Sequence, residues 1–386
     1  MAGHPVTQVL RDRARSGSRP GARRDPYRVA LVVEGGAMRG VVSGGMVAGL
    51  EALGLRDAFD VVYGSSAGAC AGAYFVAGQA RHGARLYYEV VNTRRFINPL
   101  RGLQGRAIID LDYLFDDVLT ERLPLDFAAV QRSGIDLVVL ASHLDGETGQ
   151  SNGNGRVNGS VQHVEAVRFS SFQDAADLIG ALHASSRLPV VGGDPFTYRG
   201  QRFWDAAITQ PIPVHAALAD GCTHVLVLLT LPRNTRPRQM GLLDRLLVAP
   251  RVATASPSLA AMYWTRSERY RETCHMISQQ SARPERAPYV LGVTADASSP
   301  VIGRSEIRAP LLVAAARAGG DAVLTAFGRA DARMDETLLA VTTRGEPVDV
   351  ALGAGDEAPG VHSCDGTDAY ATTSRNGTTH DWEARA

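Results

Sequence analysis

The segment with the clearest chemical potential reads Gly-Ser-Ser-Ala-Gly over residues 64–68. It lies between a predicted short strand (59–63) and a predicted helix of small residues (67–78). A serine at the centre of such a turn stands above the sheet, and the flanking Gly64 and Gly68 avoid clashes there. The N-terminal N–H groups and dipole of the helix would favour negative charge developing at Ser66. Ser66 is therefore a candidate nucleophile; the alternative is a glycine-rich turn that only packs a helix closely on a sheet.

A glycine-rich loop, Glu-Gly-Gly-Ala-Met-Arg-Gly over residues 34–40, directly follows the continuous apolar run 29–33. Adjacent glycines let the backbone present several N–H groups toward one point, as acyl transfer requires where the tetrahedral oxyanion forms. A dinucleotide or phosphate loop is disfavoured, because G-x-G-x-x-G is absent and no Gly-Lys-Ser/Thr closes the loop. Arg39 either supplies charge to a phosphate headgroup or braces the loop by pairing with a carboxylate; we favour the second.

Asp205 is the third chemical group, set in a nearly all-apolar segment over residues 204–214. Burying a carboxylate without a partner is costly. A hydroxyl that Asp205 deprotonates is one explanation of this placement. A helix N-cap or a turn aspartate is the other.

The chain resembles the patatin-like phospholipase family in three motifs and in their order. They are the Gly-Gly-x-x-Arg-Gly loop, the Gly-x-Ser-x-Gly turn and a distant aspartate. Residues 184–189 (Ala-Ser-Ser-Arg-Leu-Pro) resemble the family's Ala-Ser-x-x-x-Pro segment, and residues 136–149 resemble a strand and turn of its bacterial members. The resemblance covers about residues 28–325. The three motifs together are far more specific than any one of them.

The resemblance implies a serine acyl hydrolase that cleaves lipid acyl esters (phospholipase A, lysophospholipase or carboxylester hydrolase) through a Ser–Asp dyad and an acyl-enzyme. By motif position Ser66 is the nucleophile and Asp205 the base, and neither a metal nor a cofactor is needed. Supporting positions are Arg39, Gly40, Gly64 and Gly68. The backbone donors of the oxyanion hole are expected at Gly35, Gly36, Ala37 and Met38.

One position departs from the family pattern. The family usually has Asp-Gly-Gly or Asp-Gly-Ala, whereas this chain has Ala206 after the aspartate. If the family conformation needs a positive φ there, alanine would strain it and could shift the carboxylate. A catalytically impaired lipid-binding or regulatory protein with the same fold is therefore the alternative function. A histidine triad that uses His215, His224 or His275 is a weaker alternative, because nothing in the sequence singles out one of them.

Predicted strands alternate with predicted helices, which indicates a mainly parallel sheet covered on both faces. With the resemblance, the expected fold is a three-layer α/β patatin-like domain over residues 27–330. Further strands are expected at 137–141, 224–230 and 289–293, and helices near 172–185, 214–220, 257–280 and 306–328. An Arg-rich tail (1–26) and an acidic tail (346–386) both have the composition of disordered segments.

The composition of the chain limits which other classes of protein and site remain possible. The 386 residues carry a net charge of zero, which gives no indication of nucleic-acid binding. Four scattered cysteines predict neither a zinc site nor a disulfide framework. No signal peptide or membrane span is evident, so the cytoplasm is the expected location. Residues 233–251 combine arginines with a leucine stripe on a predicted helix (238–249), a pattern that suits either peripheral membrane contact or a cap over the protein's own core.

Overall fold

The computed structural model describes residues 3–144, 166–235, 241–242, 244–329 and 333–334. Its centre is one eight-stranded sheet with the strand order β5-β6-β3-β2-β1-β7-β8, in which β4 pairs separately with β3. The strands are β1 (Val29–Val33), β2 (Val61–Ser65), β3 (Asp136–His143), β4 (Val167–Phe169), β5 (Phe196–Tyr198), β6 (Gln201–Asp205), β7 (His224–Leu229) and β8 (Tyr289–Thr294).

The middle of the sheet is parallel and one side is antiparallel. Strands β3, β2, β1, β7 and β8 run parallel to one another. Strands β4 and β6 pair antiparallel with β3, and β5 with β6. The parallel strands are buried on both faces, which explains their continuous apolar runs. The prediction of a mainly parallel α/β sheet is therefore confirmed.

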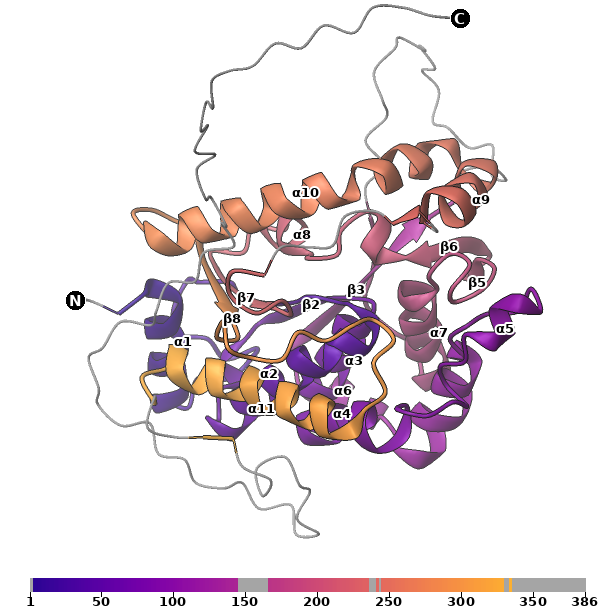
Figure 1. Ribbon diagram of the computed structural model, residues 1–386. Helices are drawn as coiled ribbons and strands as arrows, with labels where there is room; N and C mark the ends of the chain where they lie inside the picture. The colour runs from indigo at the N-terminus through magenta and orange to yellow at the C-terminus, as the bar shows by residue number, and fades with distance from the viewer. Residues whose placement is uncertain (1–2, 145–165, 236–240, 243, 330–332, 335–386) are drawn as a thin grey trace, which may run out of the picture.

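Helices cover both faces of this sheet (Figure 1). Alternate side chains of β1, such as Leu31 and Val33, pack with the helices α2, α3 and α11. The intervening Ala30 and Val32 pack with α8 and α10 on the opposite face. Helices predicted near 172–185, 214–220, 257–280 and 306–328 are present as α7, α8, α10 and α11. The α-helices are α1 (Pro5–Arg15), α2 (Gly40–Ala52), α3 (Ala67–Val76), α4 (Ala80–Arg85), α5 (Leu100–Leu103), α6 (Phe127–Arg132), α7 (Ala175–Ser186), α8 (Val214–Ala219), α9 (Ala249–Ala255), α10 (Pro257–Ala282) and α11 (Ala309–Ala326).

Short 3₁₀ and π-helical segments connect these elements. The 3₁₀ turns are η1 (Ala37–Arg39), η2 (Arg56–Ala58) and η5 (Ala206–Ile208), and the π-helical segments are η3 (Leu86–Val90), η4 (Tyr113–Arg122) and η6 (Asp244–Val248). Helix α9 begins at Ala249, where the sequence pattern predicted a helix to end; Pro250 falls in its first turn, where a proline is tolerated. No helix in the described ranges has both the length and the apolar character needed to cross a bilayer.

The N-terminal segment is folded, so the prediction of a disordered tail over 1–26 is wrong for its described part. Val6 and Leu10 of α1 are buried in the main core. The Arg13 side chain is 2% exposed and pairs with Asp25 at 2.7 Å and with Asp60 at 2.9 Å. Apolar residues at helical spacing and an arginine matched to two carboxylates hold this segment on the domain. The predicted tail 346–386 and the turn at 145–149 lie outside the described residues.

Candidate active site

Ser66 lies at the sharp turn between β2 and α3, with φ 55° and ψ −130°. A non-glycine residue in this region is strained, and such strain persists where the surroundings fix the backbone. Close packing fixes it here: a Cβ on Gly64 would lie 2.4 Å from the Cα of Ala69, and one on Gly68 would lie 2.3 Å from the carbonyl oxygen of Val33. Gly64 and Gly68 thus allow α3 to start directly against the sheet.

Asp205 ends β6, and the register of the sheet brings it to Ser66. Ser65 is level with Leu140 on β3, and the next residue of β3, Ala141, is level with Asp205. The hydroxyl of Ser66 donates a hydrogen bond of 2.7 Å to Oδ2 of Asp205. The N–H of Ala207 donates to Oδ1 at 2.7 Å. The two residues, 139 positions apart, therefore form one hydrogen-bonded pair.

The Asp205 side chain is fully buried. This burial raises its pKa to about 6, while the hydrogen bonds from Ala207 and Ser66 act in the opposite direction. A carboxylate with a pKa near neutrality is a better match to a general base than one with the ordinary value.

The glycine loop passes directly beside the serine. A Cβ on Gly35 would lie 2.9 Å from Cβ of Ser66. The N–H of Gly35 donates to the carbonyl of Pro211 at 3.4 Å, and that of Met38 donates to the carbonyl of Arg304 at 3.3 Å. The N–H groups of Gly36 and Ala37 have no protein partner within the described part of the chain. Of the four predicted donors, these two are therefore free to receive an external acceptor.

Residues 31–218 match the sequence model of the patatin-like phospholipase family. This range contains the last three residues of β1, the glycine loop, the Ser66 turn and Asp205 in the expected order. The matched domain belongs to the patatin-like phospholipase family.

Two further proteins resemble the chain. The uncharacterized protein YjjU of Escherichia coli (strain K12) is 27% identical over 210 residues, which are 54% of this chain and 53% of that protein. The chain thus spans about half the length of that curated relative. The crystal structure of VipD from Legionella pneumophila aligns with a TM-score of 0.33 and 12% identity, over 75% of this chain and 66% of VipD.

The patatin-like domain accommodates alanine after the aspartate. Ala206 begins the 3₁₀ turn η5 and is fully buried, and its φ is not among the positive values of the described residues. The backbone here does not need glycine, so Ala206 introduces no strain. The condition for a displaced carboxylate, a positive φ at this residue, is therefore not met, and Asp205 reaches Ser66.

Arg39 of the patatin-like domain braces the loop, as the sequence analysis favoured. Its guanidinium pairs with Glu34 at 3.1 Å and donates to the Thr230 hydroxyl at 2.8 Å. Glu34 is fully buried and also accepts from the Tyr270 hydroxyl at 2.9 Å. At Gly40, where the loop enters α2, a Cβ would lie 2.5 Å from the hydroxyl oxygen of Tyr87, so glycine is required by packing.

Ser185 is a supporting residue for which the sequence indicated no role. Its hydroxyl accepts a hydrogen bond of 2.8 Å from the N–H of Ser66 and so holds the strained backbone of the turn. Two residues later, the carbonyl of Arg187 accepts a hydrogen bond of 2.9 Å from the N–H of Asp205. The 184–189 segment, noted in the sequence only for its family resemblance, thus fixes both members of the pair.

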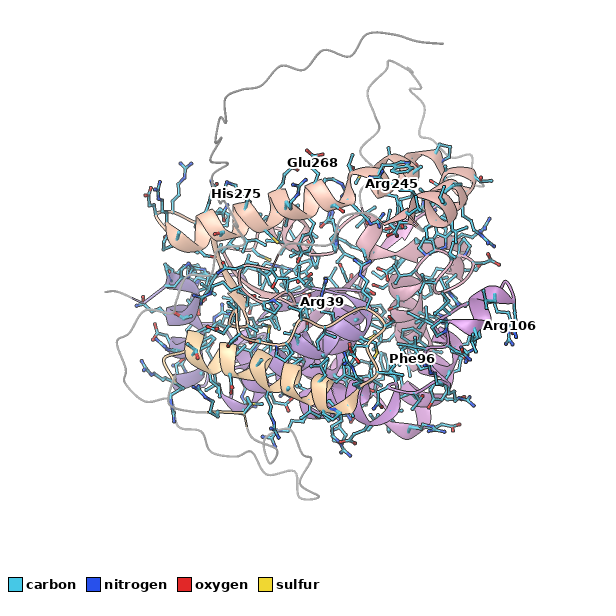
Figure 2. All side chains as sticks on the ribbon, viewed as in Figure 1. Arg39, Phe96, Arg106, Arg245, Glu268 and His275 are labelled. Carbon is cyan, nitrogen blue, oxygen red and sulfur yellow. The ribbon has the colours of Figure 1, made fainter. Side chains whose placement is uncertain are left out.

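None of the three candidate histidines contacts this pair. His215 lies near Thr273, and His224 contacts Thr223 at the far end of β7. Figure 2 shows His275 on α10, well away from Arg39 of the glycine loop. In the described residues, no histidine hydrogen-bonds to Ser66 or Asp205, so the alternative of a triad built on these histidines gains no support.

Three neighbouring cavities, which share lining residues, lie on this side of the serine. The inner cavity, about 50 Å³, is lined by Ser66 and by apolar side chains including Leu86, Phe96 and Leu114. The middle cavity, about 300 Å³, is lined by Ala207 and Tyr263 and shares Ala37 and Leu188 with the inner one. The outer cavity, about 530 Å³, shares Ile108 and Ile109 with the middle one and is lined by Arg101, Arg106, Arg187 and Arg251.

Proposed function

We propose that this patatin-like protein is a serine acyl-ester hydrolase acting on lipid esters, with Ser66 as nucleophile and Asp205 as its base. The observation that carries this proposal is the 2.7 Å hydrogen bond from the Ser66 hydroxyl to a buried aspartate of raised pKa. Nucleophile and base in hydrogen-bond contact are the arrangement that covalent catalysis by serine requires.

In the first step the Ser66 Oγ attacks the ester carbonyl carbon as Asp205 Oδ2 takes the hydroxyl proton. The tetrahedral oxyanion receives hydrogen bonds from the free N–H groups of Gly36 and Ala37. Collapse of this intermediate expels the alcohol, which takes the proton from Asp205, and leaves the acyl-enzyme. Water then attacks the acyl carbon, again losing its proton to Asp205, and the proton returns to Ser66 as the carboxylic acid leaves.

Two variants test the nucleophile. Ser66→Ala should abolish hydrolysis of p-nitrophenyl butyrate and labelling by a fluorophosphonate probe, with an unchanged circular dichroism spectrum. The matched control is Ser65→Ala at the adjacent position, because the Ser65 hydroxyl donates to the carbonyl of Gln210 rather than to Asp205. This variant should still be labelled by the probe. If Ser66→Ala retains more than a few per cent of the wild-type rate, the assignment is wrong. A wild-type protein that neither hydrolyses esters nor labels would favour the lipid-binding alternative.

Contact with a lipid surface belongs to the same proposal. Leu242, Leu246 and Leu247 are 71, 62 and 56% exposed, so these leucines do not form a cap on the core. On α5, across the outer cavity, Leu100 and Leu103 are 64 and 86% exposed. Figure 1 places α5 and α9 at the same edge of the molecule.

Exposed arginines lie close in sequence to these leucines. Arg106 beside α5 and Arg245 in η6 are both exposed, and Figure 2 shows Arg106 at this edge and Arg245 at the top of the view. Leucines that enter the acyl boundary, flanked by arginines that meet headgroups, are the pattern of peripheral attachment to anionic membranes. We propose that this edge faces the membrane, so that the outer cavity opens toward lipid.

A further inference from the structure

The middle cavity carries two arginines beside the reacting pair. Arg304, from the loop between β8 and α11, and Arg266, from α10, line it together with Ala37 of the glycine loop and Ala207 next to Asp205. A molecule whose ester lay at Ser66 would therefore have its neighbouring groups beside these two guanidinium groups.

Only one of these arginines lacks a carboxylate of its own. Arg266 pairs with Asp244 at 3.1 Å and stacks on the Tyr263 ring at 3.7 Å from its centroid. Arg39, also nearby, is engaged by Glu34. The Arg304 side chain has no hydrogen-bond or ion-pair partner in the described ranges. Its charge is thus available to a ligand.

The electrostatic surroundings of Arg304 favour an added anion. Crowding by protein atoms, followed by the nearby charges of Arg39 and Arg266, lowers its pKa, while Asp205 and Asp244 act in the opposite direction. Arg304 nevertheless keeps an exposed surface, so a ligand can reach it. An anion bound there would relieve the repulsion among the arginines.

The backbone holds Arg304 in a fixed relation to the glycine loop. Its carbonyl accepts the N–H of Met38, the residue after Ala37. The backbone of Arg304 is therefore anchored to the same loop that presents the free N–H groups of Gly36 and Ala37. Charge recognition at Arg304 and oxyanion binding at the loop are thus built on one hydrogen-bonded unit.

We propose that Arg304 binds the phosphate of a glycerophospholipid and so determines the enzyme's preference for phospholipids over neutral acylglycerols. This inference rests on the proposed function and names the substrate class for its site. A planar guanidinium matches the two oxygens of a phosphodiester. In glycerophospholipids the phosphate is a few bonds from the scissile ester, and the middle cavity directly adjoins the inner cavity at Ala37.

The kinetic test compares dihexanoyl phosphatidylglycerol with dihexanoylglycerol, which share the same acyl chains. Arg304→Gln should lower the ratio of kcat/KM for the phospholipid to that for the neutral lipid by about tenfold or more, the effect of losing a charge-assisted hydrogen bond. Arg304→Lys should lower the ratio less, because the charge remains. The control is Arg308→Gln in the same loop, where the side chain pairs with Glu306 and does not line the cavity; it should leave the ratio unchanged.

A binding measurement separates this inference from the proposed function. Calorimetry with the non-hydrolysable di-O-hexyl phosphatidylglycerol on Ser66→Ala needs no turnover, and adding Arg304→Gln should weaken binding about tenfold. Equal losses of kcat/KM on both substrates would instead show that Arg304 only maintains the shape of the loop. An unchanged ratio of kcat/KM would show that Arg304 contacts no phosphate. Competition by inorganic phosphate as strong as that of the ether lipid would make this a free-phosphate site. Each of these three results overturns the inference.

Discussion

Replacing Asp205 with asparagine should remove activity and yet stabilise the protein at alkaline pH. Asparagine is nearly isosteric, can still accept the Ala207 N–H and can still bond the Ser66 hydroxyl, so the packing of the site is kept. What the change removes is a buried negative charge. Loss of the base should lower kcat/KM by several orders of magnitude.

The size of the stabilisation follows from the pKa. Burial raises the Asp205 pKa from 3.8 to about 6, so the folded protein favours the neutral acid. This favourable contribution is complete below pH 3.8 and is lost as the pH rises through about 6. At about 1.36 kcal/mol for each pH unit between the two pKa values, ionised Asp205 costs roughly 3 kcal/mol at pH 8. For a domain of roughly 300 residues that corresponds to about 5 °C in Tm.

The measurement is the Tm of wild type and Asp205→Asn at pH 5 and pH 8. The advantage of the variant should be about half its full size at pH 5, which lies between the two pKa values, and near its full size at pH 8. The control is Asp136→Asn. Asp136 is exposed and lies at the other end of β3, the strand that pairs with Asp205, so the Tm difference of this variant should not change between pH 5 and pH 8. An equal Tm difference at both pH values would refute the assignment of a buried, ionisable Asp205.

Four other outcomes are expected. The kcat/KM for p-nitrophenyl butyrate should rise with pH to a plateau above an inflection near 6, because only ionised Asp205 accepts the proton; a flat profile from pH 5 to 8 would contradict this. Gly35→Ala should cost at least about 100-fold in kcat in a folded protein, since its Cβ would lie 2.3 Å from a backbone oxygen beside the nucleophile. Arg13→Ala should lower the free energy of unfolding by about 3 kcal/mol, as measured by urea denaturation, because it leaves two carboxylates without their buried partner; a loss below about 1 kcal/mol would return α1 to the role of a dispensable tail. Leu242→Glu with Leu246→Glu should weaken sedimentation with phosphatidylglycerol vesicles and leave butyrate hydrolysis intact; unaltered sedimentation would remove this edge from the membrane proposal.

The parallel half of the fold could be predicted because its strands are continuous apolar runs. β1 and β7 are buried on both faces, and their sequences carry that pattern directly. The antiparallel strand β6 begins with two polar, exposed residues, and β5 has only three residues, so neither carries a comparable signal. Helix α1 was missed although Val6 and Leu10 recur at helical spacing, because the surrounding arginines resemble a disordered composition.

The residues of the site also differ in whether the sequence could predict them. Ser66 could be predicted because a local turn motif defines it, and Asp205 because an acid in an apolar segment needs an explanation. Ser185 had only a neighbouring sequence pattern and no chemical reason of its own. Arg304 had neither, because it lies in an irregular loop and reaches the middle cavity only through the folding of distant segments.

The size of the inner cavity sets how rates should depend on the acyl chain. A water needs roughly 10–15 Å³ by the same measure, so 50 Å³ holds a few waters and no long chain. A butyryl group fits with little rearrangement, whereas any longer chain must first separate side chains such as Phe96 and Leu114. That separation is one conformational event with one free energy, shared by all chains that need it. Plotted against chain length, kcat should therefore fall in a single step and then stay level, and the height of the step would report the free energy of opening the cavity.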